Sequence, residues 1–535
     1  MTKVERFQHV ESPLPQTYHA WQLFGAGLEQ FGEQGAPSRL ALRPPKDNEV
    51  LLRVDAVGIC LSDIKIITLG GEHPRLRGRD LRTEPVVLGH ECAVTVVAAG
   101  ANYAEQFPKG RRYIVQADIY YQGRGLAFGY MLAGGMAEYT YVDERVLEGD
   151  EGCYLLPVAP HVGYSQAALA EPWACVEMSY SLEESPLPEG STLLVGNVDV
   201  DLNTPRITEV HRVALEAAEQ LQGEYDTIVL ESPRPGLVTH LFTCLRGKGK
   251  MLLLGEPAEE GASAVDVGAI HYGGKRIYGG AKTIPDLARR YTRHDFLPGG
   301  TALLFGAGGP MGQMHVQRAI ELPQGPALVV AVDLDAKRLA HLERRYAALA
   351  QTRGRTLRTV CGRDFPEPAL LLEHVKTLAP SGYTDIVILA PAPALVPSLL
   401  GLASDSAFVN VFAGVPLGSY ADIPLRHLCR GIHIVGSSGS RIRDLRCVLD
   451  RIERGELNTN LSVAAVGGLN AAADGLRAVK EARFPGKVVL YPHIHFPLTP
   501  LEELGTAAPS VASKMAPDGA WTREAEHALL EAYLP

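Results

Sequence analysis

Residues 301–312 read Thr-Ala-Leu-Leu-Phe-Gly-Ala-Gly-Gly-Pro-Met-Gly. The apolar run Ala302–Phe305 predicts a strand, and the glycines after it predict a tight turn into a helix over Gln313–Glu321. Glycines at such a turn let backbone N–H groups approach a pyrophosphate at the helix N-terminus. The loop is one residue longer than the strict G-x-G-x-x-G pattern, so a plain strand–helix turn is the alternative. The strand before the loop and the helix after it favour a dinucleotide-binding α/β domain.

The strand after this helix indicates which dinucleotide fits. Ala327–Val332 is apolar and runs into Asp333, 21 residues after Gly312, close to the spacing of about 20 expected for a carboxylate that binds the ribose hydroxyls. A carboxylate repels a 2′-phosphate, so NAD is favoured over NADP. Arg338 either reaches the same ribose or lies on a solvated helix face. The predicted cofactor-binding residues are Gly306, Gly308, Gly309, Pro310, Met311, Gly312, Asp333 and Arg338.

The chain repeats this α/β pattern upstream of the glycine loop. Pro188–Gly196 matches Pro298–Gly306, and Glu224–Leu230 matches Gly382–Leu389. The offset is 158 residues at Tyr225/Tyr383 and 159 at Gly255/Gly414, so the register holds over several strands. Such self-similarity predicts two related α/β units.

The two copies differ at the phosphate loop. After Gly196 the first copy continues Asn197-Val198-Asp199, without the glycine run or the helix that follows it. We interpret the first copy as a degenerate, non-binding half; the alternative is an unrelated α/β insertion. Our hypothesis is that 191–297 extends the sheet or forms a subunit interface.

The first 150 residues show a β-rich pattern instead of the alternating α/β pattern. Short runs of alternating or apolar residues separated by Gly and Pro predict a β-rich region. The predicted strands are 48–60, Cys92–Ala98, Arg112–Gln116 and Ala137–Val142. A helical period follows over Ser165–Leu182, with Glu171 in its first turns.

Four side chains of this region form a mixed ligand set. Cys60, His90, Glu91 and Glu171 come from three separate segments. Taken singly, each has an ordinary explanation: a buried thiol, a core or surface histidine, or an acid near a helix N-terminus. Together they suit a catalytic zinc, which uses three protein ligands and keeps one position open, whereas structural zinc is closed by four Cys or His.

Composition excludes several classes of protein. A net charge of −10 and a pI near 6.0 argue against general nucleic-acid binding. No apolar run approaches the roughly 18 residues that cross a bilayer, and Met1–Phe7 carries charges where a signal peptide needs an apolar core. The eight cysteines form no Cys-x-x-Cys pair. We therefore expect a cytoplasmic homo-oligomer acting on a small molecule, with no membrane or nucleic-acid partner.

Three motifs carry a resemblance to a known family. G-I-C-L-S-D at 58–63, G-H-E at 89–91 and A-E-P-W-A-C-V at 170–176, followed by the glycine loop, resemble the medium-chain zinc-dependent alcohol/polyol dehydrogenases. Within that superfamily the chain more closely resembles the L-sorbose-1-phosphate reductase branch. The likeness spans roughly 35–185 and 298–535 and does not extend over 191–297.

The resemblance implies a GroES-like catalytic domain split around a Rossmann domain. Its expected parts are 1–187 (first catalytic part), 188–297 (inserted degenerate Rossmann-like unit), 298–440 (NAD-binding domain) and 441–535 (C-terminal return). The fold class is thus α/β with a β-rich part. The structural zinc lobe of many relatives needs four cysteines, and Arg112–Glu138 contains none, so we expect one zinc.

The resemblance also assigns roles. Cys60, His90 and one or both of Glu91 and Glu171 bind zinc, with exchange between the two glutamates during turnover; Glu91 thereby counts among the catalytic residues. Ser62 begins a proton relay, and Asp63 orients the ligand histidine. The alternative for Ser62 and Asp63 is that both are simple turn residues.

The function expected from these parts is a zinc- and NAD-dependent dehydrogenase. Its substrate would be a secondary alcohol of a polyol, sugar or sugar phosphate, interconverted with the ketone. The arginine-rich segment 75–82 suits phosphate binding, or else is a solvated loop or subunit contact. The rivals are a zinc lyase or NADP-dependent reductase of the same architecture, and a non-catalytic nucleotide-binding or assembly protein.

Overall fold

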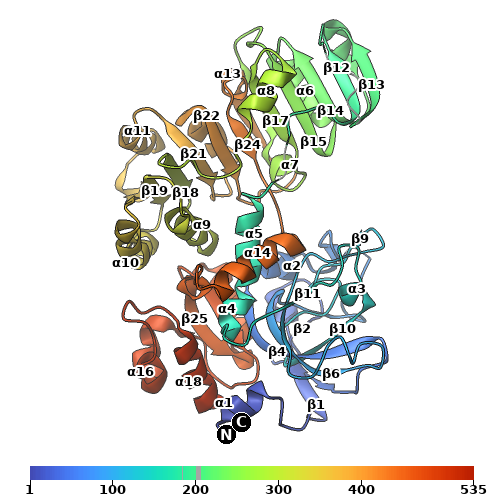
Figure 1. Cartoon of the computed structure of the whole chain (residues 1–535), viewed down its shortest axis with the longest axis vertical. Helices are drawn as coiled ribbons and strands as arrows, with labels where there is room; N and C mark the ends of the chain where they lie inside the picture. The colour runs from blue at the N-terminus through green and yellow to red at the C-terminus, as the bar shows by residue number, and fades with distance from the viewer. Residues whose placement is uncertain (77, 183–184, 200–205) are drawn as a thin grey trace. The chain divides into compact units, whose positions relative to one another are not determined.

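The computed structural model describes residues 1–76, 78–182, 185–199 and 206–535, which form two compact units (Figure 1). Unit 1 comprises Met1–Glu177 and Gly439–Pro535, and unit 2 comprises Met178–Ser438. The chain leaves unit 1 at the end of helix α5 (Ala170–Met178) and has returned to it before α14 (Ile442–Glu453). Unit 1 is therefore built from both ends of the sequence, as the split catalytic domain requires.

Unit 1 is centred on an eight-stranded, largely antiparallel sheet. Its order is β11-β7-β6-β4-β26-β25-β27, with β10 also paired to β4. The strands are β4 (Glu49–Ile59), β6 (Glu91–Ala99), β7 (Arg112–Val115), β10 (Tyr139–Asp143), β11 (Leu155–Pro157), β25 (Val463–Gly468), β26 (Lys487–Tyr491) and β27 (Thr499–Pro500). The predicted strands correspond to β4, β6, β7 and β10. The C-terminal return extends the sheet beyond β4, because β26 pairs with the end of β4 and places Val488 opposite Ile59.

Strand β4 is buried along its whole length, although its sequence alternates polar and apolar residues. The two polar side chains in its middle, Arg53 and Asp55, pair with each other at 2.7 Å. Asp55 also accepts a hydrogen bond from Thr95 on β6. Buried charges are tolerated when they are paired and hydrogen-bonded. Both faces of β4 are therefore covered, which the alternating pattern alone did not predict.

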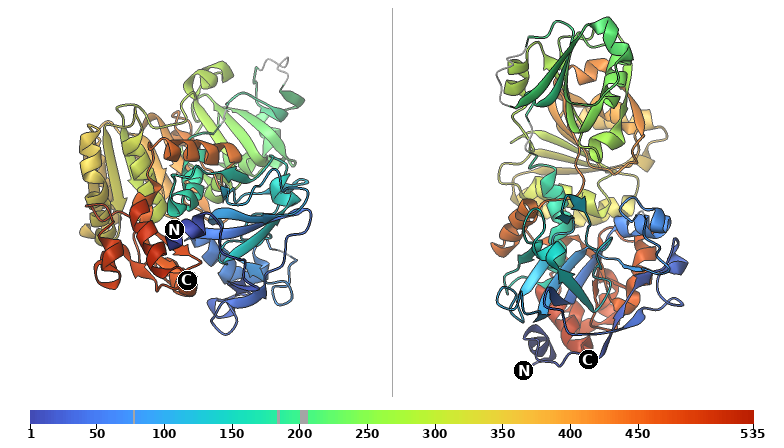
Figure 2. Two further views of the ribbon diagram at one scale, coloured as in Figure 1. Left: turned by 60° about the horizontal axis from the view of Figure 1, so that its bottom comes forward. Right: turned by 90° about the vertical axis from the view of Figure 1, so that its right-hand side faces the viewer.

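Unit 2 contains one eleven-stranded sheet to which both repeats contribute. The order is β13-β12-β14-β15-β17-β24-β22-β21-β18-β19-β20. The first copy supplies β12 (Gly190–Val195), β13 (Ile207–Val213), β14 (Tyr225–Glu231), β15 (Leu245–Leu254) and β17 (Arg276–Ala281). The second copy supplies β18 (Thr301–Phe305), β19 (Leu328–Asp333), β20 (Thr356–Cys361), β21 (Tyr383–Ile388), β22 (Ala403–Val411) and β24 (His433–Val435). Figures 1 and 2 show the first copy in green and the second in yellow-green to orange.

Within each copy the strands are parallel, and the order is the same when read outward from the middle of the sheet. Starting from the centre, the first copy reads β17-β15-β14-β12-β13, and the second reads β24-β22-β21-β18-β19 before the extra strand β20. The degenerate Rossmann-like unit is thus present, and it extends the sheet. The eleven-stranded sheet contains strands from both sides of the predicted boundary between 297 and 298.

The C-terminal segment folds back onto unit 1. Its last helix, α18 (Arg523–Tyr533), packs beside α1 (Lys3–Gln8), so the two ends of the chain are neighbours (Figures 1 and 2). Trp521 is fully buried and donates its indole N–H to the Tyr491 hydroxyl at 2.9 Å. Trp521 thus anchors the C-terminal tail to unit 1.

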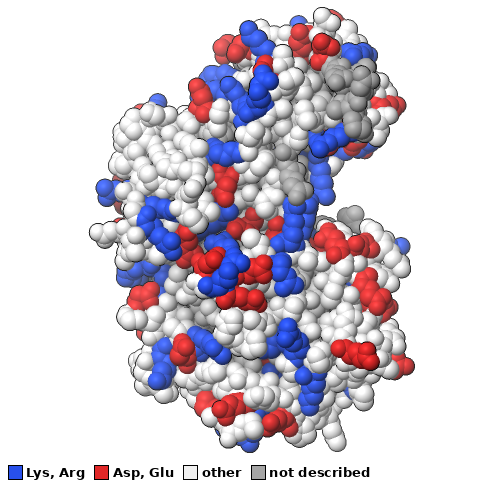
Figure 3. Space-filling view, in the orientation of Figure 1, with Lys and Arg blue, Asp and Glu red and all other residues white. Residues whose placement is uncertain are grey.

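On the face shown in Figure 3, Lys and Arg are interspersed with Asp and Glu, and neither sign of charge forms a large continuous patch. Among the described residues, every helix is too short or too polar to pass through a lipid bilayer.

Candidate active site

Cys60 lies where β4 ends and α2 (Leu61–Leu69) begins. Its backbone N–H donates to Asp63 Oδ2 at 2.9 Å, which caps the first turn of the helix. The thiol is half-buried. The Gly-Ile-Cys-Leu-Ser-Asp stretch therefore makes a strand end followed by a capped helix start, and this geometry holds the Cys60 backbone in place.

His90 and Glu91 stand at the start of β6 and are both buried. The turn before them requires Gly89, because its φ is +92° and a Cβ would lie 2.9 Å from Val57. Glu91 pairs across the sheet with Gly58, where a Cβ would lie 2.0 Å from Glu91 Oε2. The glycine two residues before Cys60 thus leaves the space that the Glu91 carboxylate fills.

These side chains form a group suited to a metal. One ligand atom each from Cys60, His90 and Glu91 lies within 4.8 Å of the others. Asp63 Oδ1 is 3.4 Å from His90 Nδ1, and Ser62 Oγ is 3.3 Å from His90 Nε2. Burial by itself would lower the pKa of His90, but the Asp63 carboxylate and Cys60 raise it well above its usual value. The structure thus places Ser62 and Asp63 on opposite nitrogens of one imidazole.

Glu171 lies in the first turn of α5, beside this group but not part of it. It is 5% exposed. Burial, with the like charges of Glu91 and Asp118, raises the pKa of Glu171 to about 7, against the opposing effect of His90. Its Oε1 is 3.7 Å from the Cys175 thiol. Of the two glutamates the sequence left open, the structure therefore groups Glu91 with Cys60 and His90.

Lys487 is a component of the site that the sequence did not reveal. It begins β26 in the C-terminal return, 396 residues from Glu91, and its Nζ donates to Glu91 Oε1. The two side chains are 4% and 0% exposed. Burial alone would lower the pKa of Lys487, but the Glu91 and Cys60 charges raise it. The local signal was faint: one lysine opening the apolar run Val488–Tyr491.

The arginine-rich segment is largely used for local structure. Arg79 donates to backbone carbonyls at Glu84, Pro85 and Met131, and Arg82 pairs with the neighbouring Asp80. Arg77 lies outside the described residues. Arg75 differs from these arginines because its guanidinium stands 5.3 Å from the centre of the Tyr130 ring and pairs with Asp118 at 2.8 Å.

Tyr130 connects Arg75 to the metal-ligand group. Its ring is 5.8 Å from that of His90, and burial raises the pKa of its hydroxyl. Arg75 is therefore the one described arginine of the segment that stands next to the candidate metal site through an aromatic neighbour.

The glycine loop in unit 2 has the expected form. Helix α9 (Pro310–Glu321) begins after Gly309, with Pro310 and Met311 in its first turn. Gly306 has φ +91°, and a Cβ on it would lie 2.8 Å from the backbone of Ala390. A Cβ on Gly312 would lie 2.6 Å from the Ala307 carbonyl, so glycine is needed for the helix to approach the strand.

Asp333 faces this loop from the end of β19. Its Oδ2 accepts from the Gly308 N–H at 2.8 Å, and its Oδ1 accepts from the Asp335 N–H at 3.0 Å. Arg338 on α10 (Ala336–Thr352) covers Gly308, since a Cβ there would lie 2.9 Å from Arg338 Cβ. The predicted cofactor residues therefore converge on one loop, with Asp333 holding its backbone.

His315 lies on α9 and faces the interior of unit 2. It is fully buried, and its Nδ1 hydrogen-bonds the Tyr180 hydroxyl at 2.7 Å. Its ring packs against Phe412 at 4.4 Å. Burial lowers the pKa of His315 to about 3. His315 is therefore a packing residue of the unit 2 interior.

Comparison with known proteins gives this site a family. A family profile described as "Alcohol dehydrogenase GroES-like domain" matches residues 46–148. "Mannitol-1-phosphate 5-dehydrogenase" of Aliivibrio fischeri is 23% identical, and the match covers 91% of this chain and 92% of the relative. "L-sorbose 1-phosphate reductase" of Klebsiella pneumoniae is 24% identical, with the same coverage. These matches support a place for the chain in the medium-chain alcohol dehydrogenase superfamily.

The solved structures agree on the fold. The crystal structure of 2R,3R-butanediol dehydrogenase from Bacillus subtilis superposes with a TM-score of 0.53 at 15% identity, over 89% of this chain and 99% of that one.

The expectation that the likeness to this family does not extend over 191–297 was wrong. The segment 191–297 is a fifth of the chain, so relatives that cover 91% of the chain must align with part of it.

Proposed function

We propose that the protein is a zinc- and NAD-dependent dehydrogenase that interconverts a secondary alcohol of a polyol, sugar or sugar phosphate and its ketone. The observation that carries this proposal is the group of Cys60, His90 and Glu91, whose ligand atoms lie within 4.8 Å of one another. A thiolate, an imidazole and a carboxylate are a ligand set that zinc accepts with one position open.

The donor atoms of the group fit a zinc ion. Asp63 lies at Nδ1 of His90, which leaves Nε2 as the ligand nitrogen. Lys487 engages Oε1 of Glu91, while Oε2 is buried without a hydrogen-bond partner among the described residues. An unpartnered buried carboxylate oxygen is costly unless a cation approaches it. Cys60, His90 and Glu91 would therefore hold the metal, and Glu171 stands beside them as an exchange ligand.

When bound, zinc supplies a Lewis acid that polarises the substrate oxygen. The residues around it do the rest. Asp63 holds the His90 ring in one orientation, and Ser62 is placed to take the alcohol proton at its Oγ and pass it towards solvent. Ser62 is half-buried, so its hydroxyl has access to water. The Glu171 carboxyl, whose pKa is raised to about 7, can hold a proton at neutral pH.

The nicotinamide cofactor would bind at the glycine loop of unit 2. Backbone N–H groups at the start of α9 suit a pyrophosphate, and the Asp333 carboxylate suits the ribose hydroxyls while repelling a 2′-phosphate. This supports NAD over NADP. Arg338 beside Gly308 would contact the same ribose.

The substrate class rests on two observations. The relatives that match nine tenths of the chain are named for sugar- and polyol-phosphate reactions. Arg75, next to Tyr130, places a guanidinium near the metal-ligand group, and Asp118 holds it with a bond that a substrate phosphate or hydroxyl could exchange for its own.

The test combines metal analysis with a substrate screen. We expect purified protein to contain about one zinc per chain and to reduce NAD with at least one polyol or sugar phosphate. Cys60→Ser should lose most of the zinc and the activity, whereas the control Cys447→Ser, at an exposed position of α14, should keep both. Zinc-free protein that still binds NAD would instead support a nucleotide-binding role.

A further inference from the structure

We propose that residues 188–297 take, within a single chain, the place that a second copy of the dinucleotide domain would occupy at the sheet edge formed by β24 and β23 (Tyr420–Pro424). The strands that meet there are called the seam: β17 against β24, and β16 (Ala262–Asp266) against β23. The seam is sealed by the chain's own first repeat, so other chains cannot pair through it.

The pairing at the seam has the pattern of a twofold axis. Both pairings are antiparallel, whereas the strands within each copy are parallel. Ala264 lies opposite Asp422, and Ile277 lies opposite Ile434. The members of these pairs are 158 and 157 residues apart, which is within two residues of the offsets of 158 and 159 between the two repeats. Residues that face each other therefore hold equivalent positions in the two copies.

The neighbouring pairs are reciprocal. Ser263 lies opposite Ile423, and Val265 lies opposite Ala421. With the same offset of 158, Ser263 corresponds to Ala421 and Val265 to Ile423. Each contact is thus repeated with the roles of the copies exchanged. That exchange defines an isologous interface, the kind that two identical subunits make about a twofold axis. Here both sides belong to one polypeptide.

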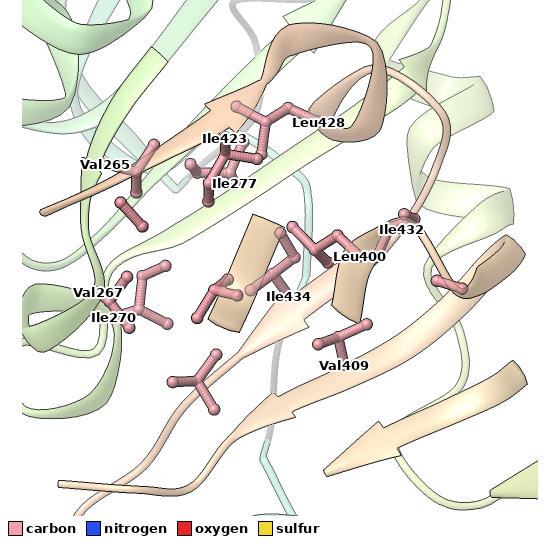
Figure 4. Packing of buried hydrophobic residues seen from close by; sticks show 14 of the residues in the cluster. Val265, Val267, Ile270, Ile277, Leu400, Val409, Ile423, Leu428, Ile432 and Ile434 are labelled. Carbon is pink, nitrogen blue, oxygen red and sulfur yellow. The ribbon is translucent and has the colours of Figure 1, made fainter. Parts of the chain in front are cut away.

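The side chains at the seam form a continuous core rather than a surface contact. The residues drawn and labelled in Figure 4 come from both copies and are each at most 2% exposed. They are Val265, Val267, Ile270 and Ile277 from the first copy and Leu400, Val409, Ile423, Leu428, Ile432 and Ile434 from the second. Left uncovered, the second-copy residues would expose an apolar patch of the kind that drives association. The first copy covers that patch.

The features that the first copy shares with the second agree with its role in covering the seam. The glycine turn is still there, since Gly196 and Gly306 both have φ +91°. The amide that follows Gly196, on Asn197, donates to the Glu231 carboxylate at 2.8 Å, so an acidic side chain already occupies this amide. The sequence of the first copy therefore lacks the glycine run of the second, whereas its described residues include the strands that form the seam.

The experiment cross-links the seam at its axis. Ala264 is half-buried and Asp422 exposed, and cross-strand neighbours have Cα separations compatible with a disulfide. We expect the double variant Ala264→Cys/Asp422→Cys to oxidise within one chain, giving a protein of 57.7 kDa and a peptide linked between the two engineered positions. Each single variant is the control. A product of twice that mass, or no linkage in the folded protein, would overturn the proposal.

A second measurement uses the unaltered chain. If the first repeat covers the seam intramolecularly, the amide protons of β16 and β23 will have the same protection from hydrogen exchange over a roughly hundredfold range of protein concentration. Protection that falls on dilution would mean that another chain supplies the pairing. Neither measurement depends on zinc, NAD or substrate. A negative result in either one would therefore leave the proposed dehydrogenase function untouched, and a negative result in the zinc and substrate assays would leave the proposal about the seam untouched.

Discussion

Replacing Lys487 by Met removes the single cation that contacts the buried Glu91 carboxylate among the described residues. At hydrogen-bond distance the attraction of such a pair is roughly 6 kcal/mol for an effective dielectric constant of 20. Both side chains are almost completely buried, and Oε2 of Glu91 already has no hydrogen-bond partner in the part of the chain that the structure describes. The variant therefore leaves a charged carboxylate unpaired, which costs about 3–5 kcal/mol of unfolding free energy.

The assay is urea unfolding of metal-free and zinc-saturated protein. We expect the full loss without metal and a smaller one with zinc, since the metal cation takes over part of the neutralisation. The double variant Glu91→Gln/Lys487→Met should recover stability relative to Lys487→Met, because it removes the orphaned charge. Lys480→Met, at an exposed position of α15 (Ala472–Lys480), should change stability by less than about 0.5 kcal/mol. A loss below about 1 kcal/mol in metal-free Lys487→Met would refute the reasoning.

Three further predictions concern other residues. Burial lowers the pKa of His315 from 6.5 to about 3, so its contribution to stability is present above pH 6.5 and is lost as pH falls towards 3; at pH 5 the loss is about 2 kcal/mol, and urea midpoints of His315→Gln should vary correspondingly less with pH than those of the native chain. Asp333→Ser should raise the NADP/NAD ratio of kcat/KM by about tenfold or more, and an unchanged ratio would exclude Asp333 from the ribose site. Gly58→Ala should weaken zinc binding by about tenfold in a chelator competition, because its Cβ would meet the Glu91 carboxylate; Gly236→Ala, where a Cβ meets nothing within 4 Å, is the matched control.

Much of the fold could be predicted because its signals are local. The strand, glycine turn and helix at 301–321 follow from periodicity and from the conformational needs of Gly306 and Gly312. The repeat was visible as a nearly constant offset of 158 to 159 residues. In the structure its two copies form the two halves of one sheet. How the halves join was not predictable, because β16, β17, β23 and β24 are short strands whose pairing depends on a twofold relation between distant segments.

The candidate site shows the same division. Cys60, His90 and Glu91 were chosen from motifs, and the structure brings them together. Lys487 was missed, since a lysine that opens an apolar run does not indicate which residue it contacts 396 positions away. The arginine segment was overinterpreted as a unit: its described members mostly bond to nearby backbone or acids, which residue type alone does not reveal. The burial of β4 was likewise hidden, because the Arg53–Asp55 pair looks like a solvated face.

The pairing of β26 with the end of β4 has a consequence for biosynthesis. At typical translation rates of 5–20 residues per second, the ribosome needs about 20–80 s to reach Lys487 after Glu91 has been made. During that interval the end of β4 beside Cys60 lacks its β26 partner, and the Glu91 carboxylate lacks its contact with Lys487. Completion of the candidate metal site is therefore among the last events of synthesis, and a truncated transcript would yield a chain with Cys60, His90 and Glu91 but without the strand that carries Lys487.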